Sequence, residues 1–375
     1  MNPKILFWTQ LFWPYIGGVE VLSSHFLREI KCLGYNIIVV TSHGSLSLPN
    51  QEEWEGITIH RFPFLRTLET RDIATIFAIK QRLIALKQQF QPDLIHINLS
   101  DPSLFFHLST ASSPAIPTLI SAKISFGRTP LTSDRLLYKA LESAHWVTAN
   151  SQAILTELHQ LFPPLVKNSS LIYNGLKIPP LAPTPLIATP PKLLCLGRVV
   201  PEKGFDLVIY ALREVIKAHP DTRLMIAGDG PQRPALERQV TLLGLTDRVE
   251  FLGWIKPEDV AALINRSTLV LMPSRWEEAF GLVALEAAMQ ARPVIASRVG
   301  GLPEVVMDGE GGIVVEKNNP QALATAICTL LSNLPQAKMM GERARTRAAE
   351  IFGWERYVWA YDALYRQLCR SKFQP

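Results

Sequence analysis

The stretch that decides the fold covers residues 273–304 and reads PSRWEEAFGLVALEAAMQARPVIASRVGGLPE. A short apolar run at residues 268–272, typical of a strand, leads into it, and a helical apolar pattern opens at Phe280. A second short strand, predicted over residues 293–297, runs directly into two further glycines. Two strand-to-helix junctions therefore follow each other closely. Each could hold an anion against the unpaired backbone N–H groups of a helix start.

Two glutamates accompany the first of these junctions. Glu278 lies just before the predicted helix, where the helix macrodipole favours negative charge, and Glu286 lies about a turn and a half inside the helix. Carboxylates beside an anion site need a partner of their own, and the hydroxyl groups of a sugar or a ribose would suit them. The stretch thus favours a ligand that carries both phosphate and hydroxyl groups.

This ordered set of residues resembles the signature of the retaining GT-B glycosyltransferases of family 4, also called group 1. That family carries two glutamates separated by seven residues, as Glu278 and Glu286 are. The match continues through FGLVALEA, PVIAS and GGLPEVV followed by GGIVV. A lone pair of glutamates would be weak evidence, whereas the ordered set is specific. The resemblance implies a glycosyltransferase of the hexosyltransferase type.

Length and composition indicate a soluble-type globular chain with two cores. A chain of 375 residues is long for one core. Its composition, with 47% hydrophobic and 19% charged residues, excludes intrinsic disorder. The net charge of +5 is spread evenly, without a basic block, so a solvated surface explains it and no nucleic-acid partner is predicted. Four separated cysteines without a C-x-x-C motif fit a reducing compartment.

The chain ends and apolar runs bear on localisation. The apolar segment after Lys4 is interpreted as a first buried strand rather than a signal peptide, because Thr9, Gln10 and Pro14 interrupt it. No uninterrupted apolar run reaches ~18 residues, so a membrane-spanning helix is not predicted. We expect a cytoplasmic protein. The apolar and basic pattern at residues 71–87 leaves peripheral contact with the inner face of the membrane open.

The element pattern predicts an α/β protein with two Rossmann-like domains, each built on a doubly wound parallel sheet. The resemblance implies that these two domains face each other across a cleft, as in the GT-B fold. Residues 179–191 contain six prolines and no charged residue, which favours an extended linker. We therefore predict an acceptor domain at 1–178 and a nucleotide-sugar domain at 192–353. The resemblance implies that a helix at 354–375 packs back on the first domain, although packing on its own domain remains an equal alternative.

Two cations near the start of the second domain predict a diphosphate site. Arg198 follows Gly197 at the end of a predicted strand, and Lys203 lies five residues later at the mouth of the next helix. Two cations beside a helix start suit a diphosphate, and the resemblance assigns the same role to this pair. We predict that Arg198, Lys203 and Glu278 are catalytic, with the cations stabilising the leaving diphosphate.

Further donor-site residues come from glycine turns and from the resemblance. The turn AGDGP is not G-x-G-x-x-G, which argues against a dinucleotide-binding oxidoreductase. The glycines in PYIGGVE let a backbone approach a ligand closely, and a loop near residue 255 corresponds to one beside the nucleotide base. The predicted donor-binding residues are Gly17, Gly18, Gly197, Arg198, Lys203, Gly228, Gly230, Ile255, Glu278, Phe280, Gly281, Leu282 and Glu286.

Three residues of the first domain are predicted to line the acceptor side or the cleft. The family usually has a histidine after a strand where this chain has Lys123, which could hold a phosphate or an acceptor anion as a point charge. His96 ends a predicted strand, where a structural role competes with a catalytic one. Tyr15 precedes the glycine pair of the first loop.

No cofactor and no metal site are predicted. The chain contains no Asp-x-Asp motif, with which metal-dependent transferases hold a diphosphate through a divalent cation. Arg198 and Lys203 would replace that metal, a hypothesis that a chelator-sensitive activity would contradict. The donor substrate is predicted to be a nucleotide-diphosphate sugar, with UDP or GDP favoured.

The predicted function is retaining transfer of a hexose-type sugar to a hydroxyl of a lipid, saccharide or small-molecule acceptor, with a role in cell-envelope polysaccharide or glycolipid synthesis. One alternative is a catalytically impaired nucleotide-sugar-binding protein, in which Lys123 marks a lost function. Another is a different GT-B enzyme such as an epimerase or a phosphorylase. Products formed from the donor without an acceptor would separate the enzyme classes, and binding without turnover would indicate the impaired protein.

Overall fold

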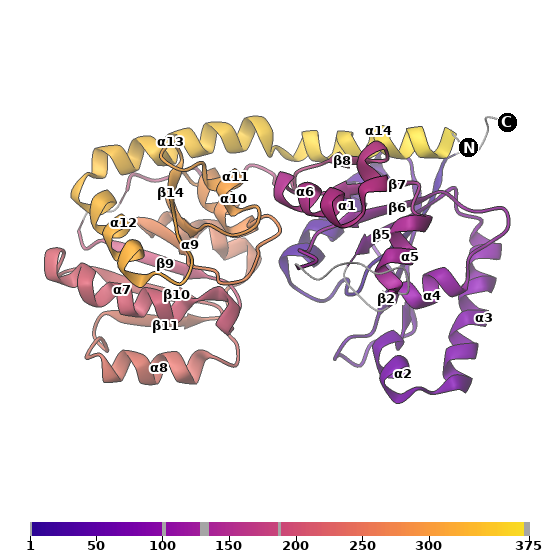
Figure 1. Ribbon diagram of the computed structural model, residues 1–375, viewed down its shortest axis with the longest axis horizontal. Coiled ribbons are helices and arrows are strands. Elements are labelled where there is room, and N and C mark those ends of the chain that lie inside the picture. Colours follow the sequence, from indigo (N-terminus) through magenta and orange to yellow (C-terminus); the bar gives the residue numbers. More distant parts are fainter. Residues whose placement is uncertain (1, 100–102, 128–134, 187–188, 371–375) are drawn as a thin grey trace. The chain divides into compact units, whose positions relative to one another are not determined.

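The computed structural model describes residues 2–99, 103–127, 135–186 and 189–370. They form two compact units, each of which is a mostly parallel sheet with helices on both faces (Figure 1). The first unit comprises the chain up to Ile172 together with the chain from Tyr357 onward, and the second comprises Tyr173–Arg356. The predicted fold class of two parallel-sheet α/β domains is confirmed.

The first unit contains an eight-stranded sheet in the order β3-β4-β2-β1-β5-β6-β7-β8. Its strands are β1 (Lys4–Trp8), β2 (Asn36–Ser42), β3 (Gln51–Trp54), β4 (Ile57–Phe62), β5 (Leu94–Leu99), β6 (Thr118–Ala122), β7 (Trp146–Ala149) and β8 (Ser169–Leu171). Its helices are α1 (Gly18–Cys32), α2 (Phe64–Thr70), α3 (Ile73–Phe90), α4 (Leu104–Ser109), α5 (Leu136–Ser143), α6 (Gln152–Leu161), the short η1 (Pro163–Lys167) and most of α14 (Trp354–Arg370).

Burial explains the order of strands in this sheet. The central strands β1, β2 and β6 are almost entirely apolar and buried, as expected for parallel strands with helices on both faces. The edge strand β3, with sequence QEEW, is largely polar and pairs antiparallel with β4. Edge strands need only half of their surface to be apolar, so this short hairpin tolerates two adjacent glutamates.

The second unit contains a six-stranded, fully parallel sheet in the order β11-β10-β9-β12-β13-β14. Its strands are β9 (Lys192–Leu196), β10 (Arg223–Ala227), β11 (Val249–Gly253), β12 (Leu269–Met272), β13 (Val294–Ser297) and β14 (Gly312–Val315). Its helices are η2 (Pro201–Lys203), α7 (Phe205–Ala218), α8 (Arg233–Leu242), η3 (Pro257–Asp259), α9 (Val260–Asn265), α10 (Leu282–Met289), α11 (Leu302–Val306), α12 (Pro320–Ser332) and α13 (Leu334–Ile351).

Alternating side chains divide this second sheet into two cores. On β9, Leu193 points to a core formed with α7, α8 and α12, whereas Leu194 points to a core formed with α9, α10, α11 and α13. The chain leaves β9 for α7 on one face and leaves β12 for α10 on the other. The neighbouring strands β9 and β12 therefore mark the point where the winding of the sheet reverses, and ligands of such sheets bind outside the carboxyl ends of the strands at this point.

The domain limits differ from the predicted ones. The division falls at Ile172 and inside α14, and the proline-rich segment 179–191 belongs to the second unit rather than standing apart as a linker. The buried Arg292 explains this difference, because its guanidinium donates to Thr184 Oγ1 at 2.9 Å as well as to the carbonyl oxygens of Ser267 and Asn265. The Asn265 side-chain amide also binds this segment, donating to the Ala182 carbonyl oxygen at 2.9 Å.

Candidate functional site

An ion pair between two predicted residues lies where the second sheet reverses its winding. Lys203 follows β9, Glu278 follows β12, and Lys203 Nζ donates to Glu278 Oε1 at 2.5 Å. The hydroxyl of Ser274 donates to the same carboxylate oxygen at 2.7 Å. Both charged side chains keep part of their surface exposed, at 27% and 18%. The structure thus joins two residues 75 positions apart in a cluster that a ligand can reach.

A second, bidentate ion pair fixes the two loops that carry this cluster. The guanidinium of Arg275 donates to both carboxylate oxygens of Asp206 at 2.6 Å and to the Pro201 carbonyl oxygen at 3.0 Å. The Asp206 carboxylate raises the pKa of Arg275. Bidentate pairs of this kind add geometric specificity as well as energy. Sequence reasoning missed both residues, because nothing in their local pattern shows that η2 and the loop after β12 approach each other.

The glycines of these turns allow close backbone approach. Gly228 has a φ of 122°, and a Cβ atom there would lie 1.8 Å from the Gly197 carbonyl oxygen, so no other residue fits. Gly281, with a φ of 101°, is the N-cap of α10 and supplies no side chain to bind the first N–H groups of that helix. Gly230 lies in the turn after β10 beside Gly228. All four glycines, Gly197, Gly228, Gly230 and Gly281, therefore lie at the carboxyl edge of the second sheet.

Arg198 lies in the same loop as Lys203 and is exposed. Among the described residues, none forms a hydrogen bond or an ion pair with its side chain. The loop itself is anchored, because the Val199 N–H donates to the Asp229 carbonyl oxygen at 2.9 Å. The guanidinium is consequently available to an anion at the carboxyl edge of β9.

Glu286, on α10, is partly buried without a protein partner in the described part of the chain. Burial raises the pKa of its carboxyl to about 7. A carboxyl group that is desolvated and left without a donor is a functional-site candidate, since a ligand hydroxyl would supply what the protein does not.

The second strand-to-helix junction was predicted to be able to hold an anion, but in the structure its backbone N–H groups already have partners within the chain. The Gly300 N–H donates to the Glu277 carboxylate at 2.6 Å, and the Gly301 N–H donates to the Glu278 carbonyl oxygen at 2.7 Å. The carboxylate of Glu277 also accepts from Lys317 at 3.1 Å. The chain therefore uses its own carboxylate where an external anion was expected, and Glu277 positions the loop that ends in Glu278.

The three predicted apolar donor residues have different surroundings. Phe280 is buried among aromatic rings, with centroids 5.4 Å from Phe352 and 6.2 Å from Tyr173. Ile255 and Leu282 are partly buried and pack against the same core. Phe280 thus supports the fold beneath the loop, while the other two keep some exposed surface.

In the first unit, the glycine pair lies at the start of α1, after the carboxyl end of β1. Gly17 is the N-cap of α1 and Gly18 is its first residue, and no side chain caps this helix start. The hydroxyl of Tyr15 donates to the His43 carbonyl oxygen and accepts from the Leu46 N–H, both at 2.7 Å. Tyr15 therefore joins this loop to the one after β2.

His96 and Lys123 do not line an open surface in the first unit. Tyr361 and Tyr365 of α14 pack against the His96 ring, Tyr357 of the same helix contacts Lys123, and both side chains are buried. His96 Nδ1 pairs with Tyr365 Oη at 2.5 Å, and its Nε2 pairs with Ser121 Oγ at 2.7 Å. The predicted acceptor contacts are thus placed inside the packing of α14, because its tyrosine face needs polar partners when buried.

The ammonium group of Lys123 lies in the same packing. Lys123 Nζ donates to Tyr357 Oη at 3.1 Å, and burial lowers its pKa to about 7. Burial and, to a smaller extent, the charge of Lys123 lower the pKa of His96. Lys123 and His96 therefore interact electrostatically with each other, and each forms a hydrogen bond with a tyrosine of α14.

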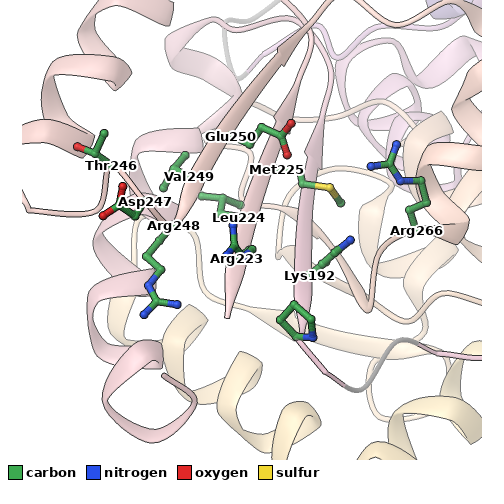
Figure 2. A pocket seen from close by; sticks show the side chains of 11 residues that line it. Lys192, Arg223, Leu224, Met225, Thr246, Asp247, Arg248, Val249, Glu250 and Arg266 are labelled. Carbon is green, nitrogen blue, oxygen red and sulfur yellow. The ribbon is translucent and has the colours of Figure 1, made fainter. Parts of the chain in front are cut away.

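A separate cavity of about 440 Å³ lies at the opposite edge of the second sheet, at the amino ends of β9, β10 and β11 (Figure 2). Figure 2 shows its charged side chains, which are Lys192, Arg223, Arg248, Arg266, Asp247 and Glu250. Four cations against two carboxylates make the cavity basic. Ligands of parallel α/β sheets bind at the carboxyl ends of the strands, so this cavity is not the candidate site.

Two features of the described residues bear on metal binding and on membrane spanning. Groups of three or more His, Cys, Asp and Glu side chains suited to hold a metal ion do not occur among them. No helix within the described ranges has the length and apolar character needed to span a bilayer.

Two family models match the chain. Glycosyltransferase Family 4 matches residues 16–178, and Glycosyl transferases group 1 matches residues 182–347. The chain belongs to the GT-B glycosyltransferases of family 4. The predicted family and the predicted enzyme class, a glycosyltransferase of the hexosyltransferase type, are therefore confirmed.

Relatives and solved structures are similar to nearly the whole length of the chain. An uncharacterized glycosyltransferase of Methanocaldococcus jannaschii is 27% identical over 370 residues, which span 96% of this chain and 97% of the relative. Sucrose-phosphate synthase from Thermosynechococcus elongatus shares the fold with a TM-score of 0.83 and 23% identity, over 99% of this glycosyltransferase and 100% of that chain. The complex of Anabaena HepE with UDP-glucose has a TM-score of 0.76 and 23% identity, over 98% and 99%.

Proposed function

We propose that this glycosyltransferase moves a hexose from a nucleoside-diphosphate sugar to a hydroxyl group of an acceptor, with retention of anomeric configuration and without a metal ion. The observation that carries the proposal is the cluster of Lys203, Glu278 and Ser274 at the reversal point of the second sheet. Arg198, exposed in the same loop as Lys203, would complete a cationic site for a diphosphate. A UDP-sugar is favoured as donor because HepE binds UDP-glucose on this fold.

The chemistry requires stabilisation of the leaving diphosphate. The bond between the anomeric carbon and the diphosphate oxygen breaks and its electron pair stays with the diphosphate. The acceptor oxygen forms the new bond to the anomeric carbon, and its proton passes to the departing diphosphate. Arg198 and Lys203 would hold the growing negative charge at fixed positions. Preorganised groups of this kind are typically worth ~10²–10³ in rate each.

The two glutamates would hold hydroxyl groups. When a diphosphate binds, the ammonium of Lys203 would exchange Glu278 for a phosphate oxygen, and Ser274 would keep the freed carboxylate in place to accept from the sugar hydroxyls. Glu286 would accept from the ribose hydroxyls. We propose retention because the spacing of these two glutamates resembles that of the retaining enzymes of this family.

A panel of UDP-, GDP- and ADP-sugars, scored by thermal shift and then by nucleotide release with and without a chelator, tests the proposal. We expect one donor to raise the melting temperature of the wild type but not of Arg198→Ala. Arg213→Ala, which removes an exposed arginine from α7, is the matched control and should behave as the wild type.

The outcomes separate the rival functions. Release of nucleotide that depends on an added acceptor supports transfer. A new sugar nucleotide or a sugar phosphate formed without an acceptor would indicate an epimerase or a phosphorylase instead. Binding without any release would indicate an impaired protein, and restoration of activity by Mn²⁺ after chelation would overturn the metal-independent site. If no nucleotide sugar shifts the melting temperature, the donor site itself is wrong.

A further inference from the structure

The carboxyl edge of the first sheet carries a group of exposed apolar side chains. They belong to segments that leave the carboxyl ends of β1, β2, β4 and β6. These side chains are Trp13, Ile16, Leu46, Leu65, Ile73, Phe77 and Ile124. Single exposed apolar residues are normal on a protein surface, but several on one edge mark an interaction site.

The most exposed members of this group lie at the corner formed by α2 and α3, which we call the α2–α3 corner and define as Phe64–Thr70 together with Ile73–Phe90. Ile73 exposes 80% and Phe77 exposes 62% of its surface, and Leu65 exposes 45%. Ile73 and Phe77 are four residues apart, so they lie on one face of α3. Ile79 and Leu83 lie on a different face of α3 and are buried, so the helix carries apolar side chains both toward the core and on its exposed surface.

The charges at this corner are mostly positive. The α3 sequence contains no acidic residue, and Lys80 and Arg82 lie on it. Arg66 and Arg71 lie on and just after α2 and are exposed. Lys87 is excluded from this count, because it is buried and donates to the Thr110 carbonyl oxygen and hydroxyl, both at 2.9 Å.

Acidic residues at the corner are few. Glu69 and Asp72 are the acidic residues between Phe64 and Phe90, against four remaining cations. The Asp72 carboxylate caps α3, where it accepts from the Thr75 N–H at 3.1 Å. An apolar face bordered by cations is complementary to a lipid surface with anionic headgroups, in which apolar side chains enter the acyl boundary and cations contact the headgroups.

The loops beside the corner are held in place rather than free to fold inward. The guanidinium of Arg61, at the end of β4, is fully buried and forms an ion pair with Glu52. It also donates to the Trp13 carbonyl oxygen at 2.6 Å. This one side chain ties the loop after β1 to the β3–β4 hairpin, so the exposed apolar residues of this edge are presented by a fixed scaffold.

We infer that the α2–α3 corner docks on an anionic lipid surface and that the acceptor carries a lipid anchor. The inference rests on the proposed function, because only a glycosyltransferase has an acceptor to bring to this edge. Parallel α/β sheets bind their ligands at the carboxyl ends of the strands, which is the edge where these apolar residues gather. A docked enzyme would meet its acceptor in the plane of the bilayer.

Flotation of the full chain with vesicles tests the docking. We expect binding to vesicles of phosphatidylcholine mixed with phosphatidylglycerol, weaker binding to phosphatidylcholine alone, and release by high salt. The double variant Ile73→Ser and Phe77→Ser should lose about tenfold in partitioning for each side chain removed. The double variant Arg66→Gln and Arg71→Gln should lose on the order of fivefold per cation, on anionic vesicles only.

Leu242→Ser is the matched control, because Leu242 exposes 85% of its surface at the end of α8 in the second unit. It should bind as the wild type does. Binding of Ile73→Ser and Phe77→Ser equal to that of the wild type overturns the inference, as does the absence of any binding to anionic vesicles. Concentration-dependent self-association that this double variant abolishes would show a second copy as the occupant and would also overturn it.

Two further measurements distinguish a failure of this inference from a failure of the proposed function. The donor-induced thermal shift of the Ile73→Ser and Phe77→Ser variant, measured without vesicles, should equal that of the wild type and also confirms that the variant folds. Transfer to a lipid-linked acceptor in anionic vesicles should fall in this variant, while transfer to a detergent-dispersed acceptor should not. A wild type that binds a donor yet transfers equally well to acceptors with and without a lipid anchor contradicts the acceptor class alone.

Discussion

The carboxyl edges of the two parallel sheets carry contrasting side chains. In the second unit this edge holds ion pairs and glycine turns, with Lys203 and Glu278 partly exposed and Arg198 exposed. In the first unit the same edge presents apolar side chains such as Ile73 and Phe77, and its central polar residues are covered. One architecture thus supports two chemistries, because the strands fix where loops emerge and the loop residues decide what can bind there.

The polar residues of the two units also differ in what they contact. His96 and Lys123 of the first unit are paired with tyrosines of α14, so they stabilise packing. The Glu286 side chain of the second unit is desolvated without a protein partner in the described residues, which is the basis for proposing it as a ligand contact. A buried polar group that is satisfied indicates structure, and one that is unsatisfied indicates a site.

The largest expected effect follows from the assignment of the donor to the second unit. Lys203→Ala should lower kcat about 10²–10³-fold, because the ammonium would stabilise charge that develops only in the transition state. Steady-state kinetics with the donor found in the panel would measure it. Lys217→Ala, on the exposed side of α7 in the same unit, is the matched control. A variant with a raised KM and an unchanged kcat would show that Lys203 binds only the ground state.

A smaller effect should come from the proton on Glu286. Its pKa of about 7 means that the empty site holds a proton through most of the range below neutral pH. If ribose hydroxyls donate to the carboxylate, binding must release this proton, so donor affinity should rise about tenfold from pH 6 to pH 8 and level off above. Calorimetric titration in buffers of different ionisation enthalpy would count the released proton.

Two variants sharpen this expectation. Glu286→Gln should bind more weakly at pH 8 and lose the pH dependence, whereas Glu214→Gln, at an exposed position on α7, should keep it. Affinity that falls with rising pH in the wild type would mean that the protonated carboxyl donates to the ligand and that the proposed role is reversed.

Sequence reasoning grouped the residues proposed for the donor because their signals are local. The strand at residues 268–272, the glycine turn and both glutamates lie within twenty positions, and Arg198 and Lys203 lie in one loop. The apolar and basic pattern noted at residues 71–87 falls almost entirely within α3 (Ile73–Phe90), since a long apolar pattern is a strong helix signal. The edge strand β3 was not predicted, because two adjacent glutamates in QEEW conceal its alternation.

Contacts between distant positions could not be predicted in this way. Arg275 and Asp206 are 69 positions apart, and neither differs in type from an ordinary surface residue. His96 and Tyr365 are 269 positions apart, so the pattern of α14 revealed an amphipathic helix but not the polar partners of its tyrosines. The same limit explains Arg292, whose surroundings convert a proline-rich segment into part of the second unit.

The smallest expected effect distinguishes packing from acceptor binding at Lys123. Burial lowers its pKa to about 7, whereas an unfolded lysine keeps its proton up to about pH 10.5. Between these values the unfolded state binds more protons, so this group's contribution to stability is present above pH 10.5 and is lost as the pH falls through 7. The groups that face the ammonium are Tyr357 of α14, which accepts its hydrogen bond, and His96 of β5, whose pKa it lowers.

Lys123→Met should therefore be more stable than the wild type by about 1 kcal/mol at pH 7, because a buried charge is replaced by an apolar side chain of similar length. Urea unfolding at pH 7 and pH 9.5 would measure this difference, which should shrink at the higher pH as the wild-type lysine loses its proton. Tyr357→Phe, which removes only the accepting hydroxyl, should destabilise the wild type and leave the Met variant unchanged. If Lys123→Met were instead as stable as the wild type but defective in transfer, with a raised KM for the acceptor alone, Lys123 would be an acceptor contact, and the two carboxyl edges would be more alike than their side chains indicate.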